Sequence, residues 1–243
     1  MQADGEKKMG STGNKSGGGI GKWVVVVLGV VLAIPLLATQ VLKYSGDDEW
    51  VFLEERDGTK MYSLKKPGES SKQFKMVLDV RAPLSTIVAA LQDPDVCEYV
   101  GCYASKQFEY VDEWSGYYTF RYDMGFPFKA REMVVLASFT QDPETKALFW
   151  EIKATPDKLP ADDCCLRLTN MHNTWHFTPQ PNGAVRLEYI VHQDMGGWMP
   201  DYLYNTGYPA GGFRQMRQLQ KIFDLEKYKT QKLAFVEEFA AAD

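Results

Sequence analysis

The last third of the chain holds a strand-like segment followed by one long amphipathic segment, and this pair limits the possible folds most. Residues 185–193 resemble a strand that stops at Gly196 and Gly197. Pro200 then stands where the first turn of a helix tolerates proline, because that residue donates no intrahelical hydrogen bond. Beyond it, apolar residues recur at helical spacing at Phe213, Met216, Leu219, Ile222 and Phe223. We predict a long helix that covers a sheet, either over a cavity or in solid packing.

Upstream of this helix the pattern is mainly that of β-strands. Residues 59–65 and 74–80 flank a Pro-Gly turn and predict a hairpin, preceded by a short element at residues 50–55. A helix is expected over residues 83–92. Further strands are expected at residues 105–112, 116–123, 131–140, 147–154, 166–178 and 184–193. Because short turns join these neighbours, we predict one curved antiparallel sheet wrapped around the C-terminal helix, with a cavity between them.

The N-terminal region predicts an anchor in a membrane. Residues 1–21 are rich in Gly, Ser and Lys, which is typical of a disordered tail. The 20 residues from Trp23 to Leu42 carry no charge, enough for a helix to cross about 30 Å of hydrocarbon. We therefore expect a transmembrane helix or signal anchor over residues 22–44. A cleaved signal peptide is the alternative, but its apolar region would be shorter, about 7–15 residues. Lysines before the span place the N-terminus in the cytoplasm and the folded domain outside it, for example in a periplasm.

Charge and cysteine content set further bounds. The net charge is −5, and Lys and Arg are scattered, so nucleic acid is excluded as the main partner. The four cysteines leave the redox state open. Cys97 and Cys102 could pair in an oxidising compartment, the adjacent Cys164 and Cys165 have an awkward geometry for pairing, and buried free thiols are equally compatible.

Catalytic and metal-binding chemistry finds little support in the sequence. His172 and His176 would lie about 13 Å apart on a strand, too far to share one zinc ion. No nucleophile elbow, P-loop or dinucleotide fingerprint is present. His192 and Asp194 could form an acid–base pair in a cavity, but a polar residue at a strand end explains His192 more simply. We predict no catalytic residue, no metal and no cofactor.

Three segments, in order along the chain, resemble the START family, the lipid-transfer domains related to steroidogenic acute regulatory protein. They are DGTKMYS at residues 57–63, GFPFKAREMVV at residues 125–135 and HQDMGGWMPDYLYN at residues 192–205. The resemblance implies an α+β helix-grip fold with an internal lipid cavity over residues 47–228, followed by a helical tail at residues 229–243. The chain departs from the family pattern at Glu132 and Met195, and residues 207–212 (GYPAGG) are expected to kink or break the final helix.

The candidate lipid-contacting residues follow from strand alternation, from the START resemblance and from the helix pattern. Tyr and Trp are favoured among them because each joins an apolar body to a polar tip. The candidates are Tyr118, Phe120, Tyr122, Met133, Val135, Trp150, Tyr189, Trp198, Met199, Tyr202, Phe213 and Met216. The alternative is that most of them are ordinary core. Arg131, at the start of its strand, is expected to have a structural role, for example with Asp194.

The predicted function is that of a membrane-anchored domain that binds and transfers a lipid or a similar apolar molecule without catalysis. The helix that begins near Pro200 is expected to move during exchange of the lipid. Two alternatives stay open at this stage: an enzyme such as a cyclase or hydrolase acting in the same cavity, or a membrane-bound sensor that binds a partner. The sequence specifies neither the lipid nor the oligomeric state.

Overall fold

The computed structural model describes residues 41 and 43–239 of the chain. The tail predicted over residues 1–21, and nearly all of the span predicted over residues 22–44, lie outside this part. Within it, no helix combines the length and the apolar character that crossing a bilayer requires.

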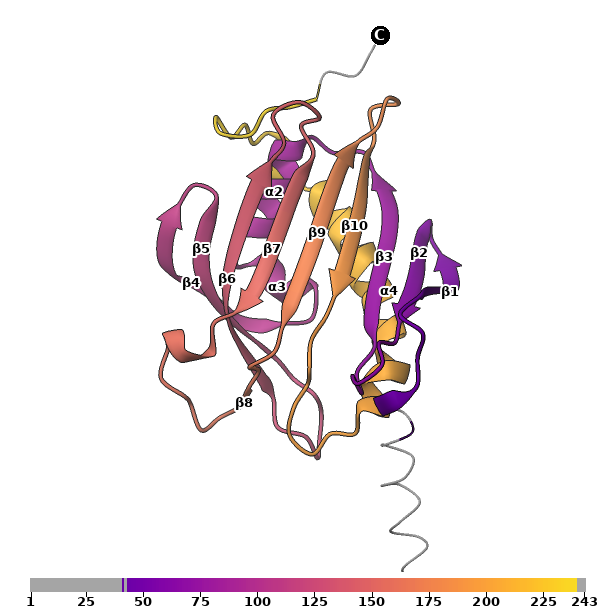
Figure 1. Cartoon of the computed structure of the whole chain (residues 1–243). Coiled ribbons are helices and arrows are strands. Elements are labelled where there is room, and N and C mark those ends of the chain that lie inside the picture. Colours follow the sequence, from indigo (N-terminus) through magenta and orange to yellow (C-terminus); the bar gives the residue numbers. More distant parts are fainter. Residues whose placement is uncertain (1–40, 42, 240–243) are drawn as a thin grey trace, which may run out of the picture.

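One curved sheet forms the body of the domain (Figure 1). Across the described residues, nine strands follow one another in the order β1-β2-β3-β10-β9-β7-β6-β5-β4, each antiparallel to its neighbours. The strands are β1 Trp50–Arg56, β2 Thr59–Leu64, β3 Gln73–Val80, β4 Tyr103–Asp112, β5 Ser115–Tyr122, β6 Arg131–Gln141, β7 Leu148–Ala154, β9 His172–Pro179 and β10 Val185–Val191. The short strand β8 (Leu166–Arg167) pairs in parallel with the start of β6.

The helices lie on one face of this sheet (Figure 1). Within residues 43–239 they are α2 Leu84–Gln92, α3 Val96–Tyr99, α4 Asp201–Phe223 and α5 Glu226–Lys229. A 3-10 turn, η1, follows β7 at Pro156–Lys158. The longest, α4, contacts β2, β3, α2, α3 and α5. This is the predicted α+β arrangement, with the long C-terminal helix held against a curved antiparallel sheet.

Strand alternation decides which face of the sheet meets the helices. In β10, Leu187, Tyr189 and Val191 are buried, whereas Arg186 points outward and pairs with Asp79 of β3. Successive side chains of a strand point to opposite faces, so every second residue of β10 belongs to the interior. The residues of β9 and β7 that pair with the inward-facing residues of β10 also face the interior.

The C-terminal half of α4 makes the solid part of the core. Its apolar stripe is almost completely buried, at 0–4% exposure, and consists of Phe213, Met216, Leu219, Ile222 and Phe223. Burial of each such side chain contributes roughly 1.5–3 kcal/mol, so this stripe fixes the helix to the sheet.

Three local expectations need correction. The strand predicted over residues 166–178 is two strands, because β8 pairs with β6 whereas β9 pairs with β7 and β10, and the chain changes partner between them. The tail beyond α5 contains no helix through residue 239. Instead, the Glu238 carboxylate accepts hydrogen bonds of 2.8 Å from the N–H groups of Leu84 and Ser85 and so caps α2. Finally, α4 is not broken at residues 207–212, because it continues as one helix there although it contains Pro209.

Candidate binding cavity

A cavity of about 500 Å³ lies between α4 and the sheet. Its floor comes from β5, β6, β7, β9 and β10, its roof from α4, and one side from α3 and the loop that leads to β4. The volume falls within the range of about 300–1,000 Å³ that is usual for small-molecule sites. The surrounding side chains are mostly apolar and aromatic, so the space suits an apolar ligand.

A row of aromatic residues forms the centre of the floor. Tyr189, Trp175 and Trp150 are register partners on β10, β9 and β7, and all three line the cavity. The rings of Tyr189 and Trp175 stack at 3.7 Å, and those of Trp175 and Trp150 lie 5.9 Å apart. Two residues further along the same strands, Leu187, Phe177 and Leu148 are at most 1% exposed and do not line the cavity. The hollow therefore ends between these two rows.

The roof contains glycines where a helix would otherwise project side chains. Gly207 and Gly211, one turn apart, both line the cavity, and a Cβ atom at either would meet nothing within 4 Å. The next glycine, Gly212, is different, since a Cβ there would approach Met76 Sδ at 2.9 Å and Met61 Cε at 3.0 Å. The missing side chains at Gly207 and Gly211 leave room under α4.

The mouth of the cavity is marked by lining residues that also reach solvent. They are Gly101, Asp123, Leu203, Gly207 and Arg214. The opening therefore lies between α4 and the ends of α3 and β5. Large apolar side chains lie in solvent near the lining residue Phe128: Trp198, at 67% exposure, packs against its ring, and the fully exposed Phe126 is two residues away in the same loop. Such an exposed apolar surface is typical of a site that meets a membrane or a partner.

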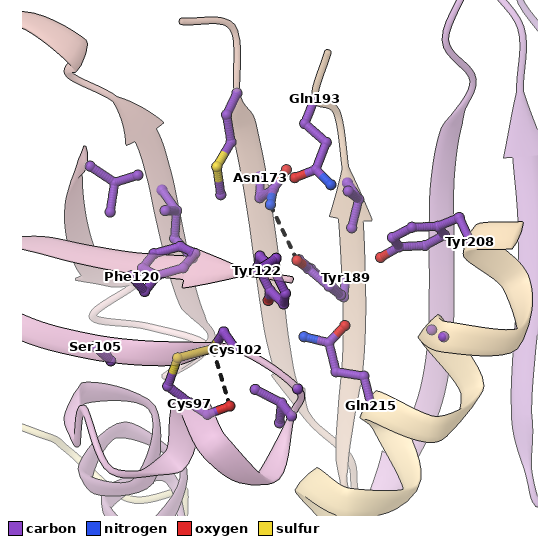
Figure 2. Close-up of a pocket in the computed structure, with 18 of the residues that line it drawn as sticks. Cys97, Cys102, Ser105, Phe120, Tyr122, Asn173, Tyr189, Gln193, Tyr208 and Gln215 are labelled. Carbon is purple, nitrogen blue, oxygen red and sulfur yellow. Dashed lines mark hydrogen bonds between the residues drawn. A yellow bond between two sulfur atoms is a disulfide. The ribbon is translucent and has the colours of Figure 1, made fainter. Parts of the chain in front are cut away.

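Polar groups gather at one part of the interior (Figure 2). Asn173 is 2% exposed; its amide nitrogen donates to the Tyr189 hydroxyl oxygen at 3.2 Å, and its carbonyl oxygen accepts from the His192 N–H at 3.0 Å. Tyr208 of α4 points toward Tyr189, and Gln215 enters from the next turns of the helix (Figure 2). Asn173 thus fixes Tyr189 while the helix supplies further polar tips.

The phenols of this region stay neutral. Burial raises the pKa of Tyr122 to about 12 and raises the pKa of Tyr189 and Tyr208 well above the usual value of 10. Burial also raises the pKa of Tyr204, a rise that the neighbouring Gln193 side chain partly offsets. A desolvated phenolate is unfavourable, so each hydroxyl keeps its proton at any physiological pH.

The structure places seven of the twelve predicted lining residues around the cavity. They are Tyr118, Phe120, Tyr122, Val135, Trp150, Tyr189 and Met199. The other five do not line it. Met133, Phe213 and Met216 are at most 4% exposed and belong to the solid core, because their side chains meet neighbours rather than the hollow. Trp198 and Tyr202, at 67% and 55% exposure, lie on the surface near the start of α4.

Sequence reasoning missed the residues that give the cavity its particular character. Asn173 interrupts an otherwise apolar strand face shared with Trp175 and Phe177, and that mismatch was a usable signal for a buried polar group. Gly207 and Gly211 were treated as helix breakers rather than as the cause of the cavity.

Arg131 has the structural role that was predicted, with different partners. Its side chain is 2% exposed and donates to the backbone carbonyl oxygens of Met195 and Gly196, the latter at 3.1 Å. Asp194 instead accepts from the Gly196 N–H at 2.8 Å. Arg131 therefore holds the β10–α4 loop against the start of β6, beside the cavity.

The histidines considered for catalysis or metal binding lie outside the cavity lining. The His192 ring faces Glu69 at 3.5 Å, so it does not form the acid–base pair with Asp194 that was considered. His172, on the opposite face of β9 from Asn173, contacts Glu151 at 2.8 Å.

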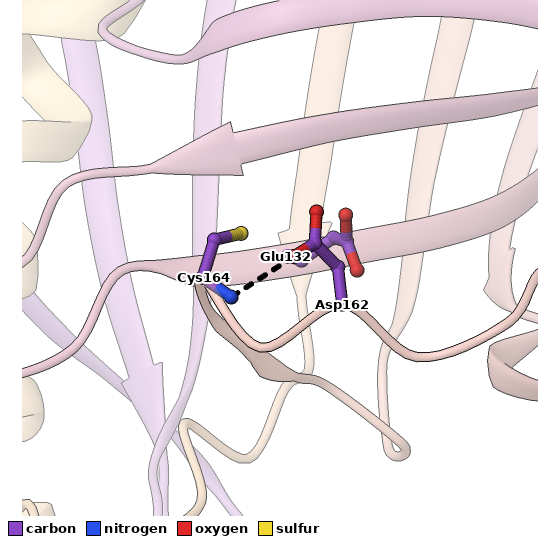
Figure 3. Close-up of side chains that lie close together, drawn as sticks. All are labelled: Glu132, Asp162 and Cys164. Atoms are coloured by element: carbon purple, nitrogen blue, oxygen red, sulfur yellow. Dashed lines mark hydrogen bonds between the residues drawn. The ribbon is translucent and has the colours of Figure 1, made fainter.

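Glu132, Asp162 and Cys164 lie close together on the outer side of the sheet (Figure 3). Ion pairs and a disulfide already occupy their ligand atoms. Glu132, a buried residue, accepts from Arg121 at 2.9 Å and from Arg167 at 2.5 Å, and Asp162 also pairs with Arg121. The Cys164 sulfur is bonded to Cys165. The cluster is therefore part of a charge network that links β5, β6 and β8.

The four cysteines, whose redox state the sequence leaves open, form two disulfides in the structure. Cys97 and Cys102 form a disulfide that closes the short loop around α3, and both residues line the cavity. Cys164 and Cys165 form the second disulfide, near the outer charge network. No described cysteine is free.

A curved antiparallel sheet closed by a long C-terminal helix over an apolar cavity defines the helix-grip class of binding domains. Residues 38–227 match the START domain family, and the chain belongs to that family. It is therefore a lipid-binding or lipid-transfer domain of the START type.

The chain is also similar to individual proteins in sequence or in fold. The uncharacterized protein PA1579 of Pseudomonas aeruginosa is 25% identical over 183 residues, covering 72% of this chain and 89% of that protein. Among solved structures, the fold resembles a STAR-related lipid transfer protein fragment from Xanthomonas axonopodis, with a TM-score of 0.68, 20% identity and coverage of 74% of this chain and 100% of the other. It also resembles human StAR-related lipid transfer protein 5, with a TM-score of 0.63, 14% identity and coverage of 84% and 98%.

Proposed function

We propose that this protein is a membrane-anchored carrier that holds one lipid, or a similar apolar molecule, in the cavity under α4 and exchanges it with a membrane. The observation that carries the proposal is the cavity of about 500 Å³, which is lined mainly by apolar and aromatic residues and opens to solvent beside exposed Trp198 and Phe126. The solved STAR-related lipid transfer proteins share its fold.

The driving force for binding is the transfer of hydrocarbon out of water. Each buried CH₂ group contributes about 0.8 kcal/mol, so a closed apolar cavity competes with a bilayer for an acyl chain or a ring system. The aromatic floor of Tyr189, Trp175 and Trp150 provides the flat apolar surface for such a ligand.

Exchange requires an opening, and the N-terminal half of α4 is the part of the roof best suited to provide it. Gly207, Gly211 and Gly212 each disfavour helix by about 1 kcal/mol relative to alanine, and Pro209 disfavours it by about 3 kcal/mol. This half also contributes few buried side chains, whereas the half after Gly212 is fixed by its apolar stripe. We propose that the first half loosens while the second half stays in place.

The position of the chain's first described residues supports a membrane anchor at the end of the domain where α4 begins. The Gly68 N–H donates to the Lys43 carbonyl oxygen at 2.7 Å, which ties the start of the domain to the β2–β3 loop. That loop reaches α4, because Ser71 donates to Asp201 at 2.9 Å and the Lys72 N–H donates to Asn205 at 2.7 Å. A membrane span just before Lys43 would hold the start of α4, and the apolar rim near it, close to the bilayer.

The proposal places the domain outside the cytoplasm. Two disulfides, Cys97–Cys102 and Cys164–Cys165, fit an oxidising compartment, since thiols in the cytosol are usually kept reduced. The lysines before the predicted span favour the same topology.

Binding rather than catalysis is proposed because of the residues that the cavity offers. His192 faces Glu69 instead of the cavity. The charged lining residues Asp93, Asp123 and Arg214 lie at its partly or fully exposed margin. The phenols inside are held neutral by their raised pKa values.

Analysis of co-purified lipid tests the proposal. The full-length chain is purified in detergent, its lipids are extracted, and their amount and identity are determined by mass spectrometry. We expect one unmodified lipid per chain and faster movement of that lipid between donor and acceptor vesicles when the protein is present. An empty protein that accelerates no transfer, or a lipid recovered in chemically altered form, would contradict the proposal.

A further inference from the structure

The cavity contains hydrogen-bond donors that have no partner in the protein. Among the described residues, the buried polar atoms without a partner are Trp150 Nε1, Trp175 Nε1, the Tyr204 hydroxyl and the Tyr208 hydroxyl, and all four residues line the cavity. The side chain of Gln193 neighbours the Tyr204 hydroxyl, so Trp150, Trp175 and Tyr208 are the groups that need a further partner. Buried polar groups in folded proteins almost always have partners, because an unpaired one retains its full desolvation penalty. Three such groups around one hollow therefore indicate a ligand with its own polar atoms.

These groups have an excess of donors over acceptors. An indole N–H can donate but cannot accept, so Trp150 and Trp175 each require an acceptor. Tyr189 adds another donor, since its oxygen already accepts from Asn173 and its O–H hydrogen is left to donate. Tyr208 of α4 points toward Tyr189 across the cavity (Figure 2). The ligand must supply oxygen acceptors between the floor row and the helix.

The lining offers no buried cation to match a negatively charged headgroup. Among the described lining residues, Arg214 is the single Lys or Arg, and its side chain lies on the exposed margin of the cavity. The acidic lining residues are Asp93, which pairs with Lys227, and the exposed Asp123. A phosphate or carboxylate placed among the tryptophans and tyrosines would lose its hydration without gaining an opposite charge, which is strongly unfavourable.

We infer that the ligand is an uncharged lipid whose ester, carbonyl or hydroxyl oxygens together accept the hydrogen bonds that Tyr208, Tyr189, Trp175 and Trp150 can donate. This inference rests on the proposed function and narrows it to one chemical class. It selects neutral lipids of the acylglycerol, ester or sterol type over anionic phospholipids and over plain hydrocarbons.

A matched series of three probes tests the inference on the full-length, delipidated chain. The probes are 1-oleoylglycerol, its 3-phosphate, and the hydrocarbon 1-octadecene, and their binding is measured by native mass spectrometry and by quenching of tryptophan fluorescence. We expect 1-oleoylglycerol to bind at least tenfold more tightly than the phosphate, and more tightly than 1-octadecene.

The Tyr208→Phe variant isolates one donor. It removes the hydroxyl and keeps the ring that stacks on Phe74 at 4.6 Å. Loss of one hydrogen bond predicts roughly 2- to 10-fold weaker binding of 1-oleoylglycerol and unchanged binding of 1-octadecene. Tyr202→Phe is the matched control, because Tyr202 lies on the same helix, is exposed and does not line the cavity. It should leave both affinities unchanged.

The outcomes separate this inference from the proposed function. Failure of all three probes to bind would contradict the proposed function itself. Binding of the phosphate or the hydrocarbon as tightly as 1-oleoylglycerol would overturn only the inference of an uncharged, oxygen-bearing lipid. Equal loss of affinity for 1-oleoylglycerol and 1-octadecene in Tyr208→Phe would also overturn it, because the hydroxyl would then act through packing.

Discussion

The two halves of α4 lie over the same sheet and do different things. After Gly212 the helix presents Phe213, Met216, Ile222 and Phe223, all nearly inaccessible to solvent, to a filled core, while Leu219 of the same stripe also borders the cavity. Before it, Gly207 and Gly211 present backbone to a hollow of about 500 Å³. The sheet shows the same contrast. The row of Leu187, Phe177 and Leu148 is tightly packed, whereas the row of Tyr189, Trp175 and Trp150 lines the hollow and contains the unpaired donors.

This difference shows that an apolar stripe on a helix marks where the helix is attached, and that missing side chains mark where a ligand fits. The two requirements oppose each other, because a well-packed interior has few voids larger than a water molecule. A binding domain of this kind therefore divides one helix between anchoring and roofing.

The largest effect is expected in the half of α4 after Gly212, which anchors the helix to the core (the anchoring half). Met216 is 0% exposed, so Met216→Ala should leave a void in a filled core and lower the free energy of unfolding by about 2–5 kcal/mol. Urea denaturation of the full-length protein measures this change. A loss well below 1 kcal/mol would show that this half is not tightly packed and would remove the contrast between the halves.

The next effect concerns the half of α4 before Gly212, which covers the cavity (the roofing half). Gly211→Leu should fill part of the hollow and weaken lipid binding by about 1–3 kcal/mol, since the ligand would then overpack the remaining space. Stability without ligand should be kept or raised. Gly211→Ala is the control, as it adds one methyl group to open space and should retain the lipid. Co-purified lipid per chain is the readout, and full lipid content in Gly211→Leu would place the ligand elsewhere.

A comparison of two adjacent glycines locates the boundary between the halves. Gly211→Ala should stabilise the protein by about 0.5–1 kcal/mol, because alanine loses less backbone entropy in a helix. In Gly212→Ala the new Cβ would come within 3.0 Å of the buried side chains of Met61 and Met76, which should cancel that gain. Thermal unfolding of both variants tests the difference, and equal melting temperatures would contradict the boundary.

The smallest effect is a dependence on alkaline pH. Burial raises the pKa of Tyr208, so between the unfolded value of about 10 and the folded value the folded protein holds a proton that the unfolded chain has lost. The stability contribution is complete below pH 10 and falls as the pH rises through the folded pKa. Relative to wild type, Tyr208→Phe should therefore gain up to about 1 kcal/mol between pH 9 and 11. Identical pH profiles of the two proteins would mean that Tyr208 is not desolvated.

The sequence was sufficient to predict the sheet, the final helix, the family and a cavity between sheet and helix, but it did not separate all of the lining residues from the core. Period-two alternation and the helical spacing of residues 213–223 depend on local geometry, which sequence reports directly. Lining residues and core residues have the same composition, so Met216 and Phe213 were predicted to line a cavity that they do not reach. Trp198 was placed inside for the same reason and is exposed.

The sequence could not predict the roles of the small and polar residues, because these roles depend on neighbours that are distant in the chain. Residues 207–212 indicate a broken helix when their propensities are considered alone, whereas tertiary packing of the second half keeps α4 continuous. Asn173 becomes meaningful only beside Tyr189, its partner across the sheet. The membrane span predicted over residues 22–44 lies almost wholly outside the described residues and stays a prediction.

The central claim is that the hollow beneath the glycine half of α4 is where the lipid lies. A crystal structure of the protein with a monoacylglycerol brominated in its acyl chain tests this directly, because anomalous scattering locates the bromine atoms. The account predicts bromine peaks between Gly211 and the row of Tyr189, Trp175 and Trp150. Bromine peaks confined to the outer surface, with Gly211 collapsed onto the tryptophans, would contradict it.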